Sequence, residues 1–413
     1  MTAVSQSPPP GALSGIRVLD MSRVLAGPWC GQLLADLGAE VIKIERPGSG
    51  DDTRGWGPPY LHDRAGRPTH ESAYFLCANR GKKSVTLDIS KPAGQALARR
   101  LAMKSDVLIE NYKAGDLTRY TLGYEQLCAL NPGLVYCSIT GFGQTGPMRN
   151  VAGYDFIIQA MAGLMSITGE RDGRPGGGPQ RVGVAVADLS TGMYATVAIL
   201  AALFHRARTG AGQYIDMALL DSQLSMIANM NMNYLIAGRA PQRMGNAHAN
   251  IVPYQVFDAA DGQLVLAVGN DNQFAKFCEA AGCTLHQDAR FRKNADRVRH
   301  REVIVPLLAE IMRQRTVAQW LALLEPIGVP VGPINDLAQA FAQPQVQSRG
   351  LQFELPHPLA GTVPSVANPI KMSATPPRYE AAPPLLGQHT QEVLGGLGID
   401  ERELAALKHD GVI

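Results

Sequence analysis

The first half of the chain alternates between short β-branched, apolar runs and amphipathic runs with helical spacing. The segments IRVLDMS, AEVIKIE, KKSVTLDI, DVLIENY and LVYCSIT are typical of buried strands, and runs such as LAGPWCGQLLADLG and GQALARRLAMK separate them as helices would. Strands that alternate with helices of this length favour a parallel, doubly wound sheet, whose ligands bind at the carboxyl ends of the strands. We therefore predict an α/β fold with its site at that edge.

The second half of the chain indicates a smaller domain and a returning tail. A long helical run, STGMYATVAILAALFHRA, precedes a strand, YIDMAL, and a further helix, LDSQLSMIANMNMNYLIAG. The segment PYQVFDAADGQLVLAVG has the alternation of a hairpin with its turn at Asp261-Gly262. A tail rich in Pro and Gly is typical of a segment that wraps over another domain or subunit. We predict a large domain, a small α+β domain and a C-terminal segment that returns to the large domain, over residues 1–225, 226–330 and 331–413.

Composition and charge exclude several classes of protein. Apolar residues make up 46% of the 413 positions and charged residues 18%, as in compact folded proteins, and the formal charge of +2 offers no field for a nucleic acid or an anionic membrane. The six cysteines lack CxxC or zinc-ligand spacing, which indicates the reduced thiols of a cytoplasmic protein. The first residues lack the features of a secretory signal, and the longest apolar stretch, residues 193–204, is shorter than the roughly 20 residues that span a bilayer. We expect no metal, no permanently bound cofactor and no membrane partner.

Asp188 lies where the apolar run VGVAVA gives way to a helix that we expect to begin near Ser190. The partial positive charge of a helix N-terminus would keep the carboxylate ionised, as a carboxylate nucleophile requires. An aspartate or a serine at this position fits a simple helix cap equally well. The spacing does not separate the two roles.

The segment GFGQTG, residues 141–146, follows a predicted strand and matches GxGxxG. Pro147 comes where a dinucleotide-binding loop would open a helix, and no acidic residue closes a second strand about 20 residues on, so a nicotinamide site is disfavoured. The backbone amides of Gly141 and Gly143 are candidates to stabilise an oxyanion. A plain strand-to-helix turn is an equally good interpretation.

Several cationic and polar residues follow predicted strand ends, where they could bind a phosphate or a carboxylate. The guanidinium fork of arginine bonds both oxygens of such a group. Most arginines only face solvent, and a histidine in a loop more often has a structural role. No GxSxG, HExxH or Walker motif is present, so those chemistries have no support. The candidates are Arg23, Arg46, Arg54, Arg80, Asn111, Arg119 and His248.

Long segments in one order resemble the class III CoA-transferases. They are LSGIRVLDMSRVLAGPWCGQLLADLGAEVIKIERPGSGDDTRGWG, NRGKKSVTLDI, ENYKAGDLTR, YCSITGFGQTGP, VADLSTGMYATVAILAAL, RTGAGQYIDMALLD, GVPVGPIND and PPLLGQHT. The resemblance covers nearly the whole chain. It implies a Rossmann-like large domain built from both chain ends, a small domain between them and an interlocked homodimer. It also implies that Asp188 is the nucleophile and that acyl-CoA and small carboxylic acids are the substrates.

The resemblance further implies which residues bind CoA and the acyl group. Arg23 and Leu25 stand where formyl-CoA transferases carry His and Gln, so the acyl site differs from theirs. Motifs such as GDDTR, AGYD and AHANIVPYQ are similar to those of members that use succinyl-CoA as donor and a dicarboxylic acid such as glutarate as acceptor. A free distal carboxylate requires a cation, for which Arg23, Arg54, Arg80 and His248 are the candidates. By position, the CoA contacts fall on Val24, Leu25, Ala26, Arg46, Leu87, Asn111 and Arg119.

Three alternatives remain beside the transferase. A racemase of 2-methylacyl-CoA shares the fold but needs a histidine in a Gly-His-Asp triplet, where this chain has Gly153-Tyr154-Asp155. A tyrosine with a pKa of about 10 replaces an imidazole of about 6.5 poorly, so the racemase is disfavoured. A nicotinamide dehydrogenase and a non-catalytic acyl-CoA-binding protein are the other two. The sequence does not identify the physiological acceptor acid.

Overall fold

The computed structural model describes residues 10–413, which divide into two compact units. The large unit contains the residues up to Leu164, Val182–Met232 and Gln347–Ile413, and the small unit contains Met165–Arg181 and Asn233–Val346. These limits differ from the predicted boundaries at 225 and 330. One reason is that segment 165–181 bonds to the small unit: the N–H of Gly245 donates to the carbonyl of Gly169 at 3.1 Å.

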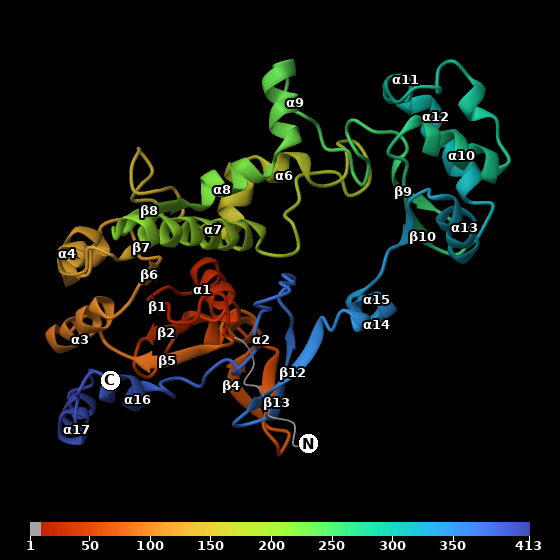
Figure 1. Ribbon diagram of the computed structural model, residues 1–413. Helices are drawn as coiled ribbons and strands as arrows, with labels where there is room; N and C mark the ends of the chain where they lie inside the picture. The colour runs from red at the N-terminus through yellow and green to blue at the C-terminus, as the bar shows by residue number, and fades with distance from the viewer. Residues whose placement is uncertain (1–9) are drawn as a thin grey trace. The chain divides into compact units, whose positions relative to one another are not determined.

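A six-stranded parallel sheet forms the centre of the large unit (Figure 1). Its inner strands are buried on both faces, as expected where helices cover both sides of a sheet. The predicted parallel sheet is therefore confirmed. The winding reverses between β1 and β6, and open α/β sheets bind ligands beside such a point. In spatial order the strands are β5 (Lys82–Thr86), β2 (Glu40–Glu45), β1 (Arg17–Asp20), β6 (Val107–Glu110), β7 (Val135–Thr140) and β8 (Gln213–Ala218).

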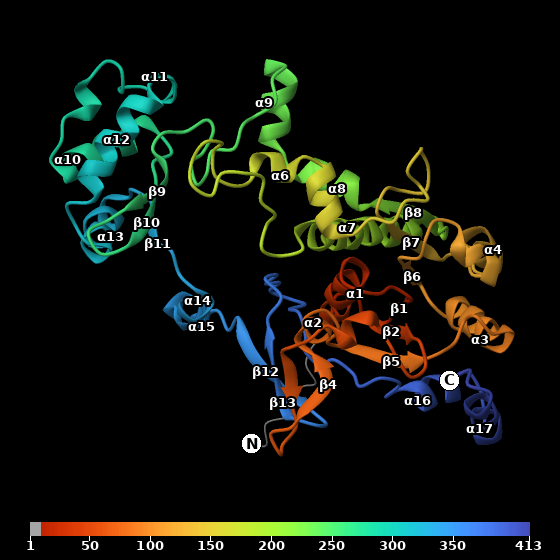
Figure 2. The same ribbon diagram turned by 180° about the vertical axis from the view of Figure 1, so that it is seen from behind.

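Two layers of helices cover this sheet (Figures 1 and 2). One apolar core joins the sheet to α1 (Ala26–Asp36), α5 (Asp155–Met161), α7 (Val186–Thr209) and α8 (Leu219–Met226). The other core joins it to α3 (Pro92–Met103), α4 (Tyr124–Leu130) and the C-terminal helices α16 (Thr390–Gly395) and α17 (Glu401–His409). The smaller elements of this unit are β3 (Tyr60–His62), β4 (Pro68–Ser72), α2 (Ala73–Leu76), β12 (Gln352–His357) and β13 (Gly361–Val366), with α15 (Pro344–Ser348) at its edge.

Helix α7 is the longest helix of the described chain, with 24 residues. It begins at Val186, earlier than predicted, and ends at Thr209; the next residue, Gly210, has a left-handed backbone (φ +77°) that suits a residue without a Cβ. By length and composition alone it is apolar enough to cross a bilayer, but half of the residues in its most apolar 18-residue stretch are buried inside the structure. A core helix passes the same test, so this single helix is weak evidence for a membrane span.

The helix predicted after β8 is two helices. Helix α8 ends at Met226, and α9 (Asn229–Ala237) follows after Ala228, whose backbone has a φ of +49°. A residue in that conformation does not continue a right-handed helix. The prediction of one continuous helix was wrong. The sequence has no Gly or Pro at the break, so nothing in the local pattern signals it.

The small unit packs helices against a short antiparallel sheet. The predicted hairpin is confirmed: β9 (Tyr254–Asp258) pairs with β10 (Gln263–Ala267), and the N–H of Ala259 donates to the carbonyl of Gly262 across the turn. The apolar core of the small unit contains several aromatic side chains, among them Phe274, Phe277 and Trp320. The remaining elements are α6 (Leu164–Ile167), α10 (Asp271–Ala281), α11 (Asn294–Arg299), α12 (Arg301–Met312), α13 (Val317–Leu324), β11 (Val331–Pro333) and α14 (Leu337–Ala342).

Two lysine–aspartate pairs are fully buried beside β1 and β2. Lys82 Nζ lies 2.8 Å from Asp20 Oδ2, and Lys43 Nζ lies 2.9 Å from Asp51 Oδ2. Lys43 also donates to the carbonyl of Ser22 at 2.8 Å, at the start of the loop after β1. Burial lowers the pKa of Lys82 to about 8, despite the attraction of Asp20. The pairs therefore tie the loop to the sheet at a considerable desolvation cost.

We expect Lys82→Met to destabilise the large unit by about 3 kcal/mol, because it leaves the Asp20 carboxylate buried without its main partner. Lys83→Met is the matched control: the neighbouring lysine is one-third exposed and pairs with Glu40 and Glu392, so its loss should cost less than about 1 kcal/mol. Urea denaturation followed by circular dichroism measures both. Equal midpoints for the two variants would contradict a structural role for the buried pair.

Candidate active site

A cavity of about 270 Å³ lies at the carboxyl ends of β6 and β7. Asn111 follows β6, Gly141 follows β7, and Asp188 reaches the same cavity from the first turn of α7. The loop after β1 forms another wall. Seven residues predicted from the sequence therefore come together here: Arg23, Val24, Leu25, Ala26, Asn111, Gly141 and Asp188.

A second cavity, of about 440 Å³, contains the other predicted CoA contacts. Arg46, Leu87 and Arg119 all line it. Arg23 and Tyr112 line both this cavity and the one that holds Asp188. The two cavities therefore adjoin along these side chains, and together they bring the whole predicted CoA-contact set to one edge of the sheet.

The loop between β1 and α1 is held in a strained conformation. Val24 has a φ of +71°, which is an outlier for a β-branched residue. Its N–H donates to Asp51 Oδ1 at 3.2 Å. The Asn111 side chain accepts a hydrogen bond from the N–H of Arg23 and donates one to the carbonyl of the same residue, at 2.9 and 2.7 Å. Asn111 therefore fixes this loop as well as facing the cavity.

Asp188 is the third residue of α7 and does not cap it. The residue at the cap position, Ala185, makes no side-chain cap bond. The Asp155 carboxylate, from α5, accepts hydrogen bonds from the N–H groups of Ala187 and Asp188 at 2.7 and 3.3 Å. The interpretation of Asp188 as a plain helix cap is therefore wrong, and its side chain is left to face the cavity.

Two of the predicted substrate-binding arginines have structural roles instead. Arg54 is buried, bonds to Glu45 and Glu71 and stacks on the ring of Phe75 at 3.6 Å. Arg80 is buried and pairs with Asp36 through two nitrogens, at 2.8 and 2.6 Å. Because every guanidinium nitrogen of both residues already has a partner, neither is free to bind a substrate carboxylate. The sequence could not reveal these partners, because the carboxylates lie up to 44 positions away and the carbonyls of Val366 and Pro384 lie 286 and 330 positions away.

Two other arginines do line the Asp188 cavity. Arg23 was predicted; its side chain is 41% exposed, pairs with Asp52 at 3.0 Å and has a buried Nε without a hydrogen-bond partner in the described structure. Arg149 was not predicted. It is exposed and, within residues 10–413, its guanidinium group makes no ion pair. It lies in a loop with no distinctive motif, so the sequence offered no signal for it.

The two glycines of the predicted oxyanion loop differ. The N–H of Gly143 donates to Thr140 Oγ1 at 2.9 Å, so the role predicted for this amide does not fit the structure. Gly141 lines the cavity, and a Cβ on it would lie 2.5 Å from Gly153 Cα, so only glycine fits there. No helix begins within segment 141–146, as expected for a loop that is not a dinucleotide site.

His248 belongs to the small unit. Its Nδ1 accepts a hydrogen bond from the N–H of Asn250 at 3.0 Å, and its ring packs against Tyr254 with centroids 5.2 Å apart. Its assignment to a substrate carboxylate stays a prediction. Elsewhere in the part of the chain that the structure describes, no three His, Cys, Asp or Glu side chains are grouped so as to hold a metal ion.

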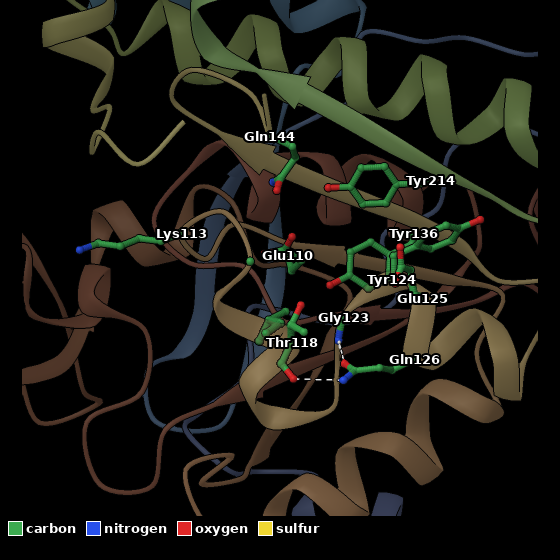
Figure 3. A pocket seen from close by; sticks show the side chains of 12 residues that line it. Glu110, Lys113, Thr118, Gly123, Tyr124, Glu125, Gln126, Tyr136, Gln144 and Tyr214 are labelled. Atoms are coloured by element: carbon green, nitrogen blue, oxygen red, sulfur yellow. Dashed lines mark hydrogen bonds between the residues drawn. The ribbon is translucent and has the colours of Figure 1, made fainter. Parts of the chain in front are cut away.

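A further cavity, of about 420 Å³, lies beside Glu110 and is shown in Figure 3. Three tyrosines, Tyr124, Tyr136 and Tyr214, form one wall, with ring centroids 5.1 to 5.9 Å apart. Burial raises the pKa of Glu110 to about 7. Of the residues predicted for the site, none lines this cavity, so we do not assign the CoA-binding role to it.

Comparison with known proteins identifies the family. The family model described as CoA-transferase family III matches residues 13–390. The chain belongs to CoA-transferase family III. It is 51% identical over 403 residues to the succinate–glutarate CoA-transferase of Agrobacterium fabrum, covering 97% of this chain and 99% of that protein. It is 46% identical to the succinyl-CoA:glutarate CoA-transferase of Mus musculus, covering 97% and 90%. A CAIB/BAIF family crystal structure from Brucella suis is 47% identical, covers 94% of this chain and 100% of its own, and has a TM-score of 0.82.

The electrostatics of Asp188 in this CoA-transferase differ from the expectation. Burial raises the pKa of its carboxyl group from the ordinary value of 3.8 to about 7, and the nearby charge of Asp155 contributes to the rise. The helix N-terminus does not offset this, because Asp155 accepts the hydrogen bonds of the first free amides. The prediction of a readily ionised carboxylate was therefore wrong. Burial and the charge of Asp155 therefore make ionised Asp188 less stable than an ordinary aspartate.

One more residue near the nucleophile candidate was missed. Tyr74, in α2, packs edge-on against Trp56 with ring centroids 5.1 Å apart. Burial raises its pKa to about 12, and the charge of Asp188 adds to this effect, which places the two side chains within electrostatic range. Trp56 was noted in the sequence, but Tyr74 follows a different strand, and no spacing rule connects it to Asp188.

Proposed function

We propose that this CoA-transferase moves CoA from succinyl-CoA to a second dicarboxylic acid such as glutarate, with Asp188 as the covalent nucleophile. The observation that carries the proposal is the cavity in which Asp188 shares walls with Val24, Leu25, Ala26 and Asn111, the positions that the family resemblance assigns to CoA. The choice of acids rests on the names of the relatives from Agrobacterium fabrum and Mus musculus.

The proposed reaction uses two exchanges at one carboxylate. The Asp188 oxygen attacks the thioester carbonyl of succinyl-CoA, which forms a mixed anhydride and releases CoA thiolate. The thiolate then attacks the carbonyl carbon of Asp188, which forms an aspartyl-CoA thioester and releases succinate. The acceptor carboxylate reverses both steps. No proton, electron or metal ion is exchanged, so acyl-CoA and the free acids are the only substrates required.

The racemase alternative is not favoured. Tyr154 occupies the position where a racemase needs a histidine, and the relatives from Agrobacterium fabrum and Mus musculus carry CoA-transferase names. The Gly141 amide stays a candidate donor for the tetrahedral oxyanions, because it faces the cavity that holds Asp188.

We expect succinyl-CoA with hydroxylamine to leave a stable adduct on the peptide that contains Asp188, because hydroxylamine traps an activated carboxyl group. Mass spectrometry of digested wild type and Asp188→Ala measures it. Glu279→Gln, an exposed carboxyl on α10, is the matched control and should retain the adduct. Binding of CoA without any modification of Asp188 would rule out covalent transfer and return attention to the acyl-CoA-binding and racemase alternatives.

The distal carboxylate of a dicarboxylic acid needs a cation near Asp188, and we assign this role to Arg149 with a smaller contribution from Arg23. Both side chains line the cavity. Arg23 already pairs with Asp52, whereas the guanidinium group of Arg149 has no such pair within the described residues. A guanidinium group free of a protein carboxylate binds a ligand carboxylate without breaking another bond.

Arg149→Met should raise the KM for glutarate about tenfold and the KM for a monocarboxylic acid such as butyrate much less, because only glutarate loses a charge-assisted bond. Arg23→Met should show a smaller difference. The exposed Arg349→Met serves as the control. Steady-state kinetics with both acids provides the test, and equal changes for glutarate and butyrate would exclude the assignment.

We also propose that the enzyme is an interlocked homodimer in the cytoplasm. Met193, Val197 and Phe204 expose more than half of their surface along one side of α7, which supports a partner surface there. The cytoplasmic location rests on six cysteines without the spacing of a disulfide framework.

Analytical ultracentrifugation should therefore give twice the chain mass of 44.2 kDa at micromolar concentration. Val197→Glu places a charge on the exposed side of α7 and should shift the equilibrium toward single chains. A wild-type protein that sediments as one chain at all concentrations would refute the dimer.

A further inference from the structure

The first turn of α7 is capped by a residue from another helix. The leading N–H groups of a helix have no partner within it and are usually satisfied by the side chain just before the first turn. Here that position is Ala185. Asp155 of α5 supplies the acceptor instead, with Oδ1 within hydrogen-bond distance of the N–H groups of Ala187 and Asp188.

A second residue of α5 fixes the segment that leads into α7. Gln159 Nε2 donates to Asp155 Oδ2 at 2.7 Å, and Gln159 Oε1 accepts from the N–H of Val182 at 2.9 Å. Asp155 and Gln159 are both at least 90% buried. The pair therefore holds both the approach to α7 and its first turn, and it holds the Asp155 carboxylate beside that of Asp188.

The Asp188 carboxylate itself receives little support. Within the described residues, no hydrogen bond to its oxygens is present, and of the ionisable groups around it only Asp155 shifts its pKa appreciably. The other ionisable residues on the elements packed against α7 do not pair with it; they are Cys30 and Asp36 of α1, Asp221 of α8, Tyr136 and Cys137 of β7, and Tyr214 and Asp216 of β8. The other ionisable groups that face it are Tyr74 on α2 and, in the cavity wall, Arg23, Asp52, Tyr112, Lys113, Asp116, Arg149 and Tyr154.

We propose that Asp155 is a positioning residue that activates Asp188: it takes the helix N-terminal amides for itself and leaves the neighbouring, half-buried carboxylate beside a like charge and without a hydrogen-bond donor from the described residues. This inference rests on the proposed role of Asp188 as nucleophile. A carboxylate that accepts two amide bonds is stabilised and is a weaker nucleophile. Because Asp155 accepts these amide bonds, Asp188 does not receive that stabilisation. The unfavourable energy of ionised Asp188 is released when its oxygen bonds to the acyl carbon and the negative charge leaves with the CoA thiolate.

The test separates the charge of Asp155 from its acceptor oxygen. Asp155→Asn removes the charge and keeps an oxygen that can accept from Ala187, whereas Asp155→Ala removes both. The readout is the rate at which the intact protein gains CoA from succinyl-CoA, by rapid quench and mass spectrometry from pH 5 to 9. In the wild type this rate should rise with pH through about 7, because the attacking form of Asp188 is ionised.

For Asp155→Asn we expect the midpoint of this rise to move down by about one pH unit and the plateau rate to fall about threefold, since a less basic carboxylate is a weaker nucleophile. Asp155→Ala should show the same shift with a much larger loss of plateau rate. Glu279→Gln, remote on α10, should change neither. An unmoved midpoint in Asp155→Asn overturns the inference, whereas a wild type that gains no CoA overturns the proposed function itself.

A second measurement does not depend on the reaction. The pKa of native Asp188 lies above its ordinary value, so its ionisation lowers stability as the pH rises through about 7. Asp188→Asn should therefore raise the melting temperature at pH 8 by more in the wild type than in Asp155→Asn, and the difference between the two backgrounds should vanish at pH 5. An equal increase in both backgrounds at pH 8 would show that the two carboxylates do not interact and would overturn the inference.

Discussion

The buried contact between Lys43 and Asp51 is the constraint on which the site depends. Lys43 rises from the centre of β2 and bonds to both Asp51 and the carbonyl of Ser22, and Asp51 in turn accepts from the N–H of Val24. The strained turn at Val24 is therefore held from the sheet below it. Without these charges the backbone would relax, because a valine does not keep a positive φ unaided. Buried ion pairs of this kind fix the conformation of the loop, but the cost of desolvating the two charges limits their net contribution to stability.

The opposite wall of the cavity is also held by a side chain from a neighbouring element. The loop after β1 is fixed by Lys43 of β2, by Asp51 and by Asn111 after β6, and the first turn of α7 is fixed by a side chain from α5. In both places a side chain from a neighbouring element supplies part of the support of the element that faces the ligand. Neighbouring elements therefore fix two walls of the Asp188 cavity, as preorganised sites require.

The alternation of strand and helix patterns predicted the parallel sheet because each inner strand is buried on both faces and reads as a continuous apolar run. The family resemblance located the residues around the two cavities. The sequence did not predict ion pairs between residues that are distant in the chain: nothing near Arg54 or Arg80 indicates that these arginines pair with Glu71 and Asp36. It failed for Asp155 for the same reason, since 32 positions separate it from the amide that it caps. Local spacing rules describe a helix and its own cap, not a cap supplied from elsewhere.

The return of the C-terminal segment to the large unit has a consequence for synthesis on the ribosome. Leu394, Leu397 and Val412 complete the apolar core on one face of the sheet, and the N–H of Asp88 donates to the carbonyl of Val412. Helices α3 and α4 are translated close to the strands that they cover, yet the part of the covering that α16 and α17 supply is translated long after the last strand of that sheet, β8. A nascent chain that lacks α16 and α17 therefore displays part of this apolar surface uncovered, and such surface is what chaperones and proteases act on.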